Sequence, residues 1–213
     1  MVKVKVRGET VLSHLPNSGR LVTVLAPDSK VFLRRRMGEK RKSCYDLFIV
    51  ERFGLPIIVD TRFSTFAAKT TIEHGWIGAL RGYKVTSENV RVNGALLDFQ
   101  LSHNHEKYFL EVKCATHVEN DVAMFPDAPT QRGRKHVKSL MNLKRRGQNC
   151  GILFSVQRPD ATVLKPNYKI DPKFSELLRE AFKEGVEIFT ISLVFRVPDE
   201  IEVKPNLPNF SFK

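Results

Sequence analysis

The pattern of apolar and turn-forming segments constrains this chain most, because the pattern changes near residue 60. Before that point, Val2–Val6 alternates valine with lysine, and turn-forming sequences separate it from further predicted strands at 21–25, 30–33 and 45–51. Such short strands are typical of a small β-barrel or sheet. An oligonucleotide-binding (OB) barrel, whose strand faces and loops bind nucleic acid, is one candidate. The sequence opens within a strand, so an earlier strand of such a barrel could be absent.

After residue 60, segments with helical period alternate with strand-like segments. We predict helices over 65–74, over 130–146 with Thr130 as N-cap, and from Pro172 to Gly185 with Asp171 as N-cap. The predicted strands are 85–92, 95–101, 108–115, 151–157 and 186–194, and the tail over 203–213 is expected to be irregular. This order predicts an α+β chain, with an OB-like β-barrel over 1–60 and a mixed-sheet α/β domain over 61–213.

The charge of the chain indicates an anionic partner. Lysine and arginine number 35 against 23 aspartate and glutamate residues, which gives a formal net charge of +12. Apolar runs are strand-sized and fall short of the roughly 18 residues that a membrane span needs. The N-terminal sequence MVKVKVRGET lacks the apolar core of a signal peptide. We therefore expect a cytoplasmic protein that binds nucleic acid and has no membrane partner.

One basic run stands out in the N-terminal part and is predicted to form a loop before the strand at 45–51. A basic loop can bind the phosphate backbone of nucleic acid, or it can simply be a solvated turn, and the sequence leaves both interpretations open. The candidate nucleic-acid-binding residues of this run are Arg34, Arg35, Arg36, Lys40, Arg41 and Lys42.

A predicted hairpin over 95–113 brings two carboxylates together. If its turn is centred between Asn104 and His105, Asp98 lies directly opposite Glu111. Two like charges at such a position are destabilising and need a neutralising partner. Lys113 is one candidate, because side chains two residues apart share a face. A divalent cation is the other, since one or two carboxylates with water and phosphate oxygens are typical ligands of Mg²⁺.

The three residues of this hairpin suggest two interpretations. With Mg²⁺ bound to Asp98 and Glu111, the metal would polarise a phosphate and activate water while Lys113 acts as a catalytic cation, which is an arrangement suited to phosphodiester hydrolysis. Without a metal, the same residues would form a partly buried ion-pair network. The Asp-x(12)-Glu-x-Lys spacing alone does not decide between them.

Basic residues also gather at the start of the predicted helix at 130, where backbone amides and the helix dipole favour phosphate. The alternative is an exposed amphipathic helix whose cations only solubilise it. A histidine in this group is expected to contact phosphate or to be structural more than to carry a proton. Two further polar residues follow the strand at 151–157 and are expected to point toward the same site. The whole set of candidates is Thr130, Arg132, Arg134, Lys135, His136, Gln157 and Arg158.

Several motifs in chain order resemble one known family. They are HLPNSGRL (14–21), the DF…YFLEVK hairpin, AMFPDAPTQRGRKHVKSL (123–140), VQRPD (156–160) and IDPKFSELLREAFKEGVEI (170–188). Together they resemble the sugar fermentation stimulation protein A family. The resemblance implies an OB-type barrel joined to a restriction-endonuclease-like core of the PD-(D/E)xK type, and it implies DNA binding. In such a core Asp98, Glu111 and Lys113 fall at the D…ExK positions of a nuclease.

The chain departs from the family's pattern on the first core helix. Members carry an acidic residue there in a stretch like N-x-L-x-x-E-A, whereas Thr70 stands at the expected glutamate and Thr65 at the expected asparagine. Glu73 follows about one turn later. Two functions therefore remain open: a Mg²⁺-dependent nuclease, or a non-catalytic DNA-binding protein that regulates sugar metabolism on an inactive nuclease scaffold.

Overall fold

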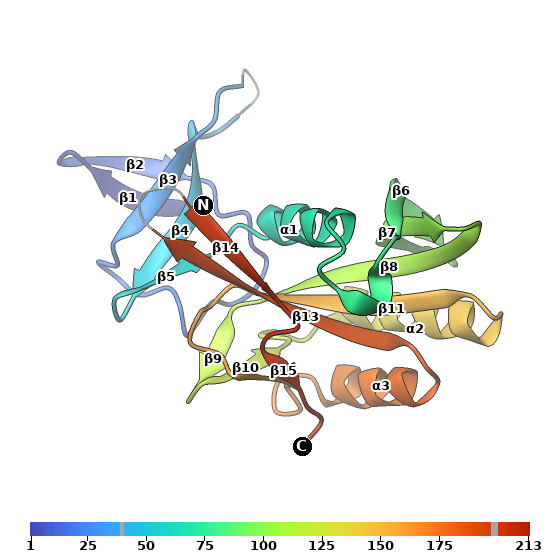
Figure 1. Ribbon diagram of the computed structural model, residues 1–213. Helices are drawn as coiled ribbons and strands as arrows, with labels where there is room; N and C mark the ends of the chain where they lie inside the picture. Colours follow the sequence, from blue (N-terminus) through green and yellow to red (C-terminus); the bar gives the residue numbers. More distant parts are fainter. Residues whose placement is uncertain (39–40, 197–199) are drawn as a thin grey trace.

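The computed structural model of the chain describes residues 1–38, 41–196 and 200–213 (Figure 1). Its N-terminal part contains two small antiparallel sheets. One is the hairpin of β1 (Val2–Val6) and β2 (Glu9–Ser13), and the other has the order β3-β4-β5, with β3 at Val31–Arg35, β4 at Tyr45–Arg52 and β5 at Leu55–Ile58. An isolated bridge between His14 and Asp46 connects the chain after β2 to β4. The strands β2 and β5 lay outside the predictions.

The strand predicted over 21–25 is wrong, because this segment is a turn. Leu21 has a positive φ of 54°, and its carbonyl accepts hydrogen bonds from the amides of Val24 and Leu25. Leu21 and Val24 are nevertheless buried in the small core of the N-terminal part. The apolar residues of this segment, which predicted a buried strand, thus pack into the core from a turn.

The remainder of the chain is built on a six-stranded mixed sheet with the order β14-β13-β11-β8-β7-β6 (Figure 1). Strands β6, β7 and β8 form an antiparallel meander, β8, β11 and β13 are parallel, and β14 returns antiparallel to β13. Their bounds are Lys84–Val92 (β6), Ala95–His103 (β7), Glu106–Ala115 (β8), Asn149–Val156 (β11), Glu187–Arg196 (β13) and Glu200–Pro205 (β14). The predicted α+β architecture is thus confirmed.

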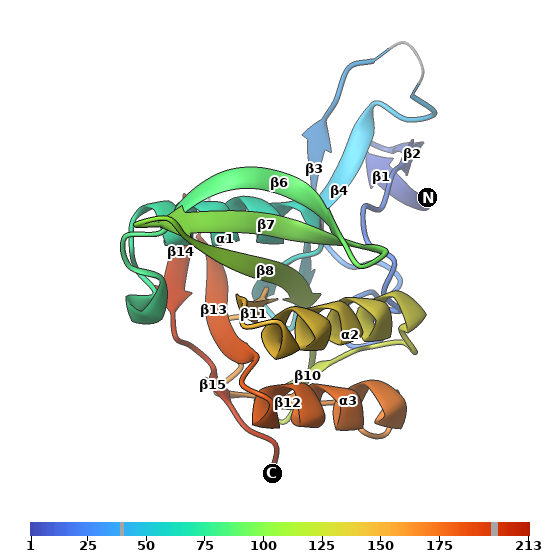
Figure 2. The same ribbon diagram turned by 90° about the vertical axis from the view of Figure 1, so that its right-hand side faces the viewer.

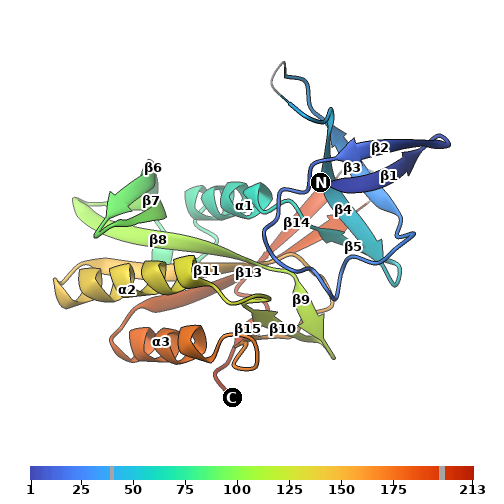
Figure 3. The ribbon, with the colours of Figure 1, turned by 180° about the vertical axis from the view of Figure 1, so that it is seen from behind.

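Three helices cover the two faces of this sheet (Figures 2 and 3). Helix α1 (Arg62–Glu73) packs on one face, while α2 (Gln131–Arg145) and α3 (Pro172–Lys183) pack on the other, and a short 3-10 helix spans Gly78–Leu80. Both predicted N-caps are confirmed, since Thr130 Oγ1 accepts from the amide of Gly133 and Asp171 accepts from that of Phe174, each at 2.9 Å. No helix in the described ranges has the length and hydrophobicity to cross a bilayer.

The C-terminal tail is more ordered than expected. It contributes β14 to the main sheet and β15 (Asn209–Phe210) to a second sheet with the order β15-β12-β10-β9. The other members are β9 (His117–Glu119), β10 (Val122–Phe125) and β12 (Val163–Pro166). Phe210 stacks on Phe154 of β11, so the tail is held by packing that its prolines and asparagines do not reveal locally.

The N-terminal part is joined to the main sheet by side chains of both. Phe195 of β13 packs against Phe32 and Phe48 in edge-on contacts. Arg62, at the start of α1, donates hydrogen bonds at 2.6 Å to the carboxylates of both Asp46 and Asp60. Because those two carboxylates are almost fully buried, the guanidinium neutralises charges that water cannot reach.

Replacing Arg62 with alanine is therefore expected to lower the free energy of unfolding by about 1–3 kcal/mol. We expect a smaller loss of stability than for a fully buried ion pair, because the Arg62 side chain is 48% exposed and Asp46 keeps Arg41 as a partner. Urea unfolding at pH 7 measures the change. The exposed Arg20 supplies the control, and a change no larger for Arg62→Ala than for Arg20→Ala would contradict this role.

Candidate functional site

The hairpin of β7 and β8 has the predicted register. Phe99 pairs with Leu110 and His103 pairs with Glu106, as a turn centred between Asn104 and His105 requires. Asp98 precedes Phe99 in β7, and its side chain contacts the backbone of β8. Its Oδ2 accepts a hydrogen bond of 2.7 Å from the backbone amide of Val112. This bond holds the Asp98 carboxylate over strand β8, beside the side chains of that strand.

Glu111 lies among three polar side chains from β8 and α2. Its Oε1 accepts hydrogen bonds from Lys113 Nζ and His136 Nδ1. Arg132 Nε donates to the other ring nitrogen of His136 at 3.4 Å. Nδ1 of the same imidazole also lies 3.1 Å from Lys113 Nζ, so Glu111, Lys113 and His136 form one buried network of polar contacts. His136 thus orients Glu111, a role that the basic character of the helix start did not reveal.

The second oxygen of Glu111 makes this arrangement fit a hard cation. Oε2 is buried and has no hydrogen-bond partner among the described residues, while Glu111 as a whole is 2% exposed. A buried carboxylate oxygen without a partner is costly unless a ligand satisfies it. Asp98 and Glu111 supply the oxygen donors that Mg²⁺, Ca²⁺ and Mn²⁺ prefer. The described ranges contain no group of three metal-ligating side chains, so water or phosphate would complete the coordination.

The two carboxyl groups have opposite electrostatic environments. Burial, reinforced by the negative charge of Glu111, raises the pKa of Asp98 to about 6, against a usual value of 3.8. Burial also acts to raise the pKa of Glu111, but the Lys113 ammonium and the His136 hydrogen bond outweigh it and hold that pKa below its usual range. Glu111 is therefore a fixed anion, whereas Asp98 carries the unfavourable charge of the pair.

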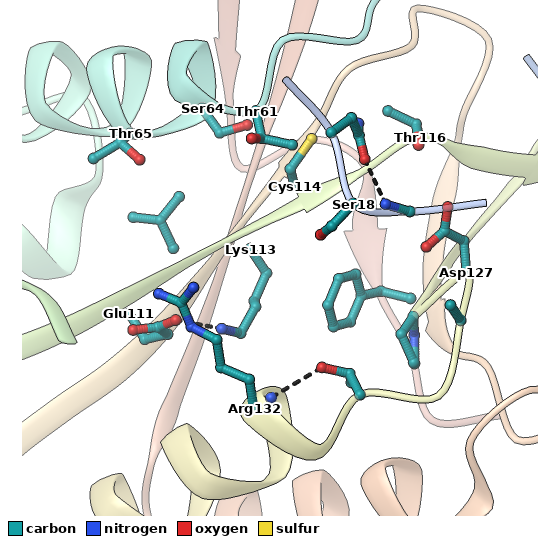
Figure 4. A pocket seen from close by; sticks show the side chains of 18 of the residues that line it. Ser18, Thr61, Ser64, Thr65, Glu111, Lys113, Cys114, Thr116, Asp127 and Arg132 are labelled. Atoms are coloured by element: carbon teal, nitrogen blue, oxygen red, sulfur yellow. Dashed lines mark hydrogen bonds and ion pairs between the residues drawn. The ribbon is translucent and has the colours of Figure 1, made fainter. Parts of the chain in front are cut away.

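These groups line a pocket of about 320 Å³ (Figure 4). One wall is the loop Asn17–Gly19 of the N-terminal part, and another is the segment from Phe125 to Gly133 that leads into α2. Glu111, Lys113 and Arg132 gather on one side of the pocket, and Asp127 lies on the opposite side. Hydroxyl groups from α1 and the neighbouring segments complete the lining, namely those of Ser18, Thr61, Ser64, Thr65, Thr116 and Thr130.

The basic residues predicted at the start of α2 have different roles. Arg132 lines the pocket, and Lys135, three residues later on α2, is exposed. Arg134 instead pairs with the buried Asp171, the N-cap of α3. The Thr130 hydroxyl caps α2. Of the cations predicted at this helix start, Arg132 alone lines the pocket.

Gln157 and Arg158 do not point into the pocket as expected. Gln157 is fully buried, and its amide nitrogen donates to Ser64 Oγ. Arg158 is 5% exposed, and its guanidinium forms a two-bond pair with Asp160. Both residues are buried behind the wall formed by α1 and the strand ends, so neither reaches a surface that a nucleic acid could contact. The buried Oε1 of Gln157 has no hydrogen-bond partner among the described residues.

The basic run was predicted to be a loop, but Arg34 and Arg35 belong to β3 and pair with β4. The run is also partly structural. The guanidinium of Arg41 pairs with Asp46, and that of Arg36 lies 3.7 Å from the same carboxylate. Arg34 stacks over the ring of Phe48, with 4.0 Å between its guanidinium carbon and the ring centroid. Arg35 and Lys42 are exposed, and Lys40 lies outside the described residues. Asp46 thus holds several cations of this run close together.

The first core helix supplies hydroxyl groups in place of the expected acid. Thr65 lines the pocket, whereas the Thr70 hydroxyl donates to the carbonyl of Phe66 within the helix. Glu73 is exposed at the end of α1 and does not line the pocket, so it does not take the place of the missing carboxylate. Ser64 and Thr61 lay outside the predictions, since isolated hydroxyl residues give no distinctive sequence signal.

The wall built by the Asn17–Gly19 loop comes from the motif HLPNSGRL (14–21), from which its place in the pocket did not follow. The amide of Leu21 donates to Asp127 Oδ2 at 3.2 Å, which ties the loop to the segment before α2. Asp127 lies shortly before α2, where an aspartate commonly stabilises the turn that precedes a helix. Instead it joins segments more than a hundred positions apart in the chain.

Comparisons with known proteins agree with this architecture. Residues 1–59 match the "SfsA N-terminal OB domain", and residues 63–198 match the "Sugar fermentation stimulation protein RE domain". The sugar fermentation stimulation protein homolog of Clostridium tetani is 36% identical over 187 residues, which are 87% of this chain and 81% of the relative. That of Methanothermobacter thermautotrophicus is 33% identical over 204 residues, 96% of this chain and 85% of the relative.

A solved structure is similar over nearly the whole chain. The structure of Pyrococcus furiosus SfsA in complex with Ca²⁺ matches with a TM-score of 0.93 and 31% sequence identity, and the match covers 99% of this chain and 90% of that one. Together with the matched domains and the relatives, it places the small N-terminal strands in an OB domain. The chain belongs to the sugar fermentation stimulation protein (SfsA) family.

Proposed function

We propose that this protein binds DNA and hydrolyses phosphodiester bonds with a divalent cation held by Asp98 and Glu111. The observation that carries the proposal is the buried Glu111 Oε2, which has no partner in the described residues and lies on the same hairpin as the Asp98 carboxylate. The bound Ca²⁺ named for the similar Pyrococcus furiosus protein supports a cation of this chemistry. When bound, the cation would polarise the phosphate and lower the pKa of a water molecule.

The residues of the chain have distinct tasks in this reaction. His136 and Lys113 fix the rotamer of Glu111, and Asp98 is fixed by the amide of Val112. The ammonium of Lys113 and the guanidinium of Arg132 offer positive charge to a phosphate that becomes more negative in the transition state. A water oxygen forms the new bond to phosphorus, the bond to the leaving sugar oxygen breaks, and that oxygen takes up a proton.

Cleavage assays with pure protein test this proposal directly. Single-stranded and double-stranded DNA are incubated with Mg²⁺ or Mn²⁺, beside the Asp98→Asn variant and a sample with EDTA. Metal-dependent cleavage that the variant lacks is the expected result. Absent cleavage, or equal cleavage by wild type and variant, would refute the nuclease.

A non-catalytic DNA-binding protein, regulatory in sugar metabolism, is the second candidate. It is favoured by one observation: α1 supplies Thr65 to the pocket and no carboxylate, so the metal would have few protein ligands. This candidate predicts DNA binding with no metal-dependent cleavage. The same assay, combined with a binding measurement, therefore separates the two functions.

Binding through phosphate contacts predicts a defined salt dependence. Replacing the exposed Lys135 with alanine is expected to weaken DNA binding and to lower the slope of log affinity against log salt by about 1. Fluorescence anisotropy over a salt series measures the slope. Lys183→Ala, at the far end of α3, is the matched control, and equal slopes for the two variants would contradict a contact from Lys135.

A further inference from the structure

The depth of the metal-binding groups restricts which nucleic acids can reach them. Glu111 is 2% and Lys113 is 9% exposed, and both lie within the pocket of about 320 Å³. That volume is at the lower end of the roughly 300–1,000 Å³ typical of small-molecule sites. A phosphate must enter this pocket to contact a cation on Glu111. The backbone of the reacting strand therefore has to leave the outer surface and pass between the walls.

The wall formed by Asn17–Gly19 is held at several points. The Gly19 amide donates to Asn17 Oδ1 at 2.8 Å, and Asn17 Nδ2 donates to the carbonyl of Val59 at 2.9 Å. Gly19 also lies against Asp127, so closely that an added Cβ would come within 2.4 Å of its carboxylate. The width of the pocket is thus fixed by packing between the N-terminal part and the segment before α2.

The groups inside the pocket suit one strand without its complement. Apart from the charged side chains, the polar groups of the lining are mostly neutral hydroxyl groups, including those of Ser18, Ser64 and Thr65, which can bind a sugar and the edge of an unpaired base (Figure 4). The carboxylate of Asp127, opposite Glu111, disfavours a second phosphate there. A complementary strand could not enter beside the reacting strand, because the Asn17–Gly19 loop and the start of α2 are walls of a pocket of only about 320 Å³.

We propose that the reactive site accepts single-stranded DNA and excludes intact duplex, with the Asn17–Gly19 loop as the wall that enforces this selection. The proposal rests on the nuclease function proposed above. It assigns the OB domain a role in substrate selection as well as in binding. The loop of this domain narrows the approach to Asp98 and Glu111, which belong to the other domain. Paired DNA would react only where its strands have separated.

Cleavage rates on matched substrates test this selection. One sequence is presented as a single strand and as a duplex with covalently cross-linked ends, which cannot fray. We expect wild-type protein to cleave the single strand at least about tenfold faster, a ratio that corresponds to about 1.4 kcal/mol. Equal cleavage, or faster cleavage of the duplex, would overturn the proposal.

A substitution in the wall tests its cause. Gly19→Ala forces the loop and the Asp127 carboxylate apart, and this change of the wall is expected to reduce the preference for the single strand at least threefold. Gly78→Ala is the matched control, since its Cβ would meet no atom within 4 Å, and it should keep the wild-type ratio. An unchanged ratio in folded Gly19→Ala protein would show that the loop does not select the substrate.

Photo-cross-linking separates failure of this inference from failure of the nuclease proposal. Single strands and end-linked duplexes that contain 4-thiothymidine are irradiated with the protein in Ca²⁺, and the attached peptides are identified by mass spectrometry. Attachment to the peptides of Asn17–Gly19 or 125–133 from the single strand alone supports the selection even without cleavage. Equal attachment from the duplex, or none from either substrate, overturns it.

Discussion

Asp98→Asn is expected to abolish metal-dependent cleavage and, at neutral pH, to make the metal-free protein more stable. The asparagine keeps an oxygen that accepts from the Val112 amide, so the hairpin contact is retained. It removes a negative charge that burial and Glu111 disfavour. Loss of one of two metal ligands should slow cleavage by at least about a hundredfold, because a bound cation contributes several kcal/mol to such reactions.

The gain in stability follows from the raised pKa of Asp98. In the unfolded chain the carboxyl group loses its proton near pH 3.8, whereas in the folded protein it does so near pH 6. Between these values the folded state binds more protons, so stability falls as pH rises through this window. Above pH 6 the full cost is present, about 1–3 kcal/mol at roughly 1.4 kcal/mol per pKa unit. Asp98→Asn removes that cost.

Urea unfolding in EDTA at pH 7.5 and near pH 3, well below the unfolded value of 3.8, measures this effect. The variant should exceed wild type at pH 7.5 and approach it at the lower pH, where Asp98 is protonated in both states. Asp28→Asn, at an exposed turn, is the control for a change of charge alone. A destabilised Asp98→Asn protein would contradict the assigned environment. A stable but inactive variant excludes unfolding as the cause of lost cleavage.

The hairpin was predictable because its determinants are local. Alternation with period two sets which residues share a face, and Asn104 and His105 both adopt positive φ, as a two-residue turn between antiparallel strands requires. The register of Asp98 and Glu111 follows from those two facts. The fold class was likewise readable, since the caps Thr130 and Asp171 mark the helices that cover the sheet.

The remaining parts of the site depend on contacts between distant segments. His136 reaches Glu111 only because α2 packs on the sheet beside β8. Arg158 was expected to face DNA, but Asp160 and burial decide its position. The basic run is similar, because the buried Asp46 gathers Arg41 and Arg62 from separate segments. The net charge of the sequence counts these cations as free, although they are paired with carboxylates. It therefore overstates the positive surface that is available to phosphate.

Lys113→Met is expected to have the opposite effect on stability from Asp98→Asn. Burial acts to raise the pKa of Glu111, and the positive charge of Lys113 is the first influence that opposes it. Removing the ammonium leaves a buried carboxylate with His136 as its remaining partner, which should cost about 3 kcal/mol at pH 7.5. The lowered pKa contributes its full stability above the unfolded value near 4.5 and loses it as pH falls toward the lower folded value, so the loss in Lys113→Met should shrink below pH 4.5.

The double variant Lys113→Met/Glu111→Gln provides the decisive comparison. With no charge left to neutralise, it should recover most of the stability lost in Lys113→Met, which gives a coupling energy of about 2 kcal/mol or more. Lys107→Met, at an exposed position of the same strand, controls for the change of side chain. If the loss of stability in the double variant equals the sum of the losses in Lys113→Met and Glu111→Gln, the pairing of these two residues is contradicted. A double variant that is stable and does not cleave DNA separates the role of this ion pair in folding from its role at the metal.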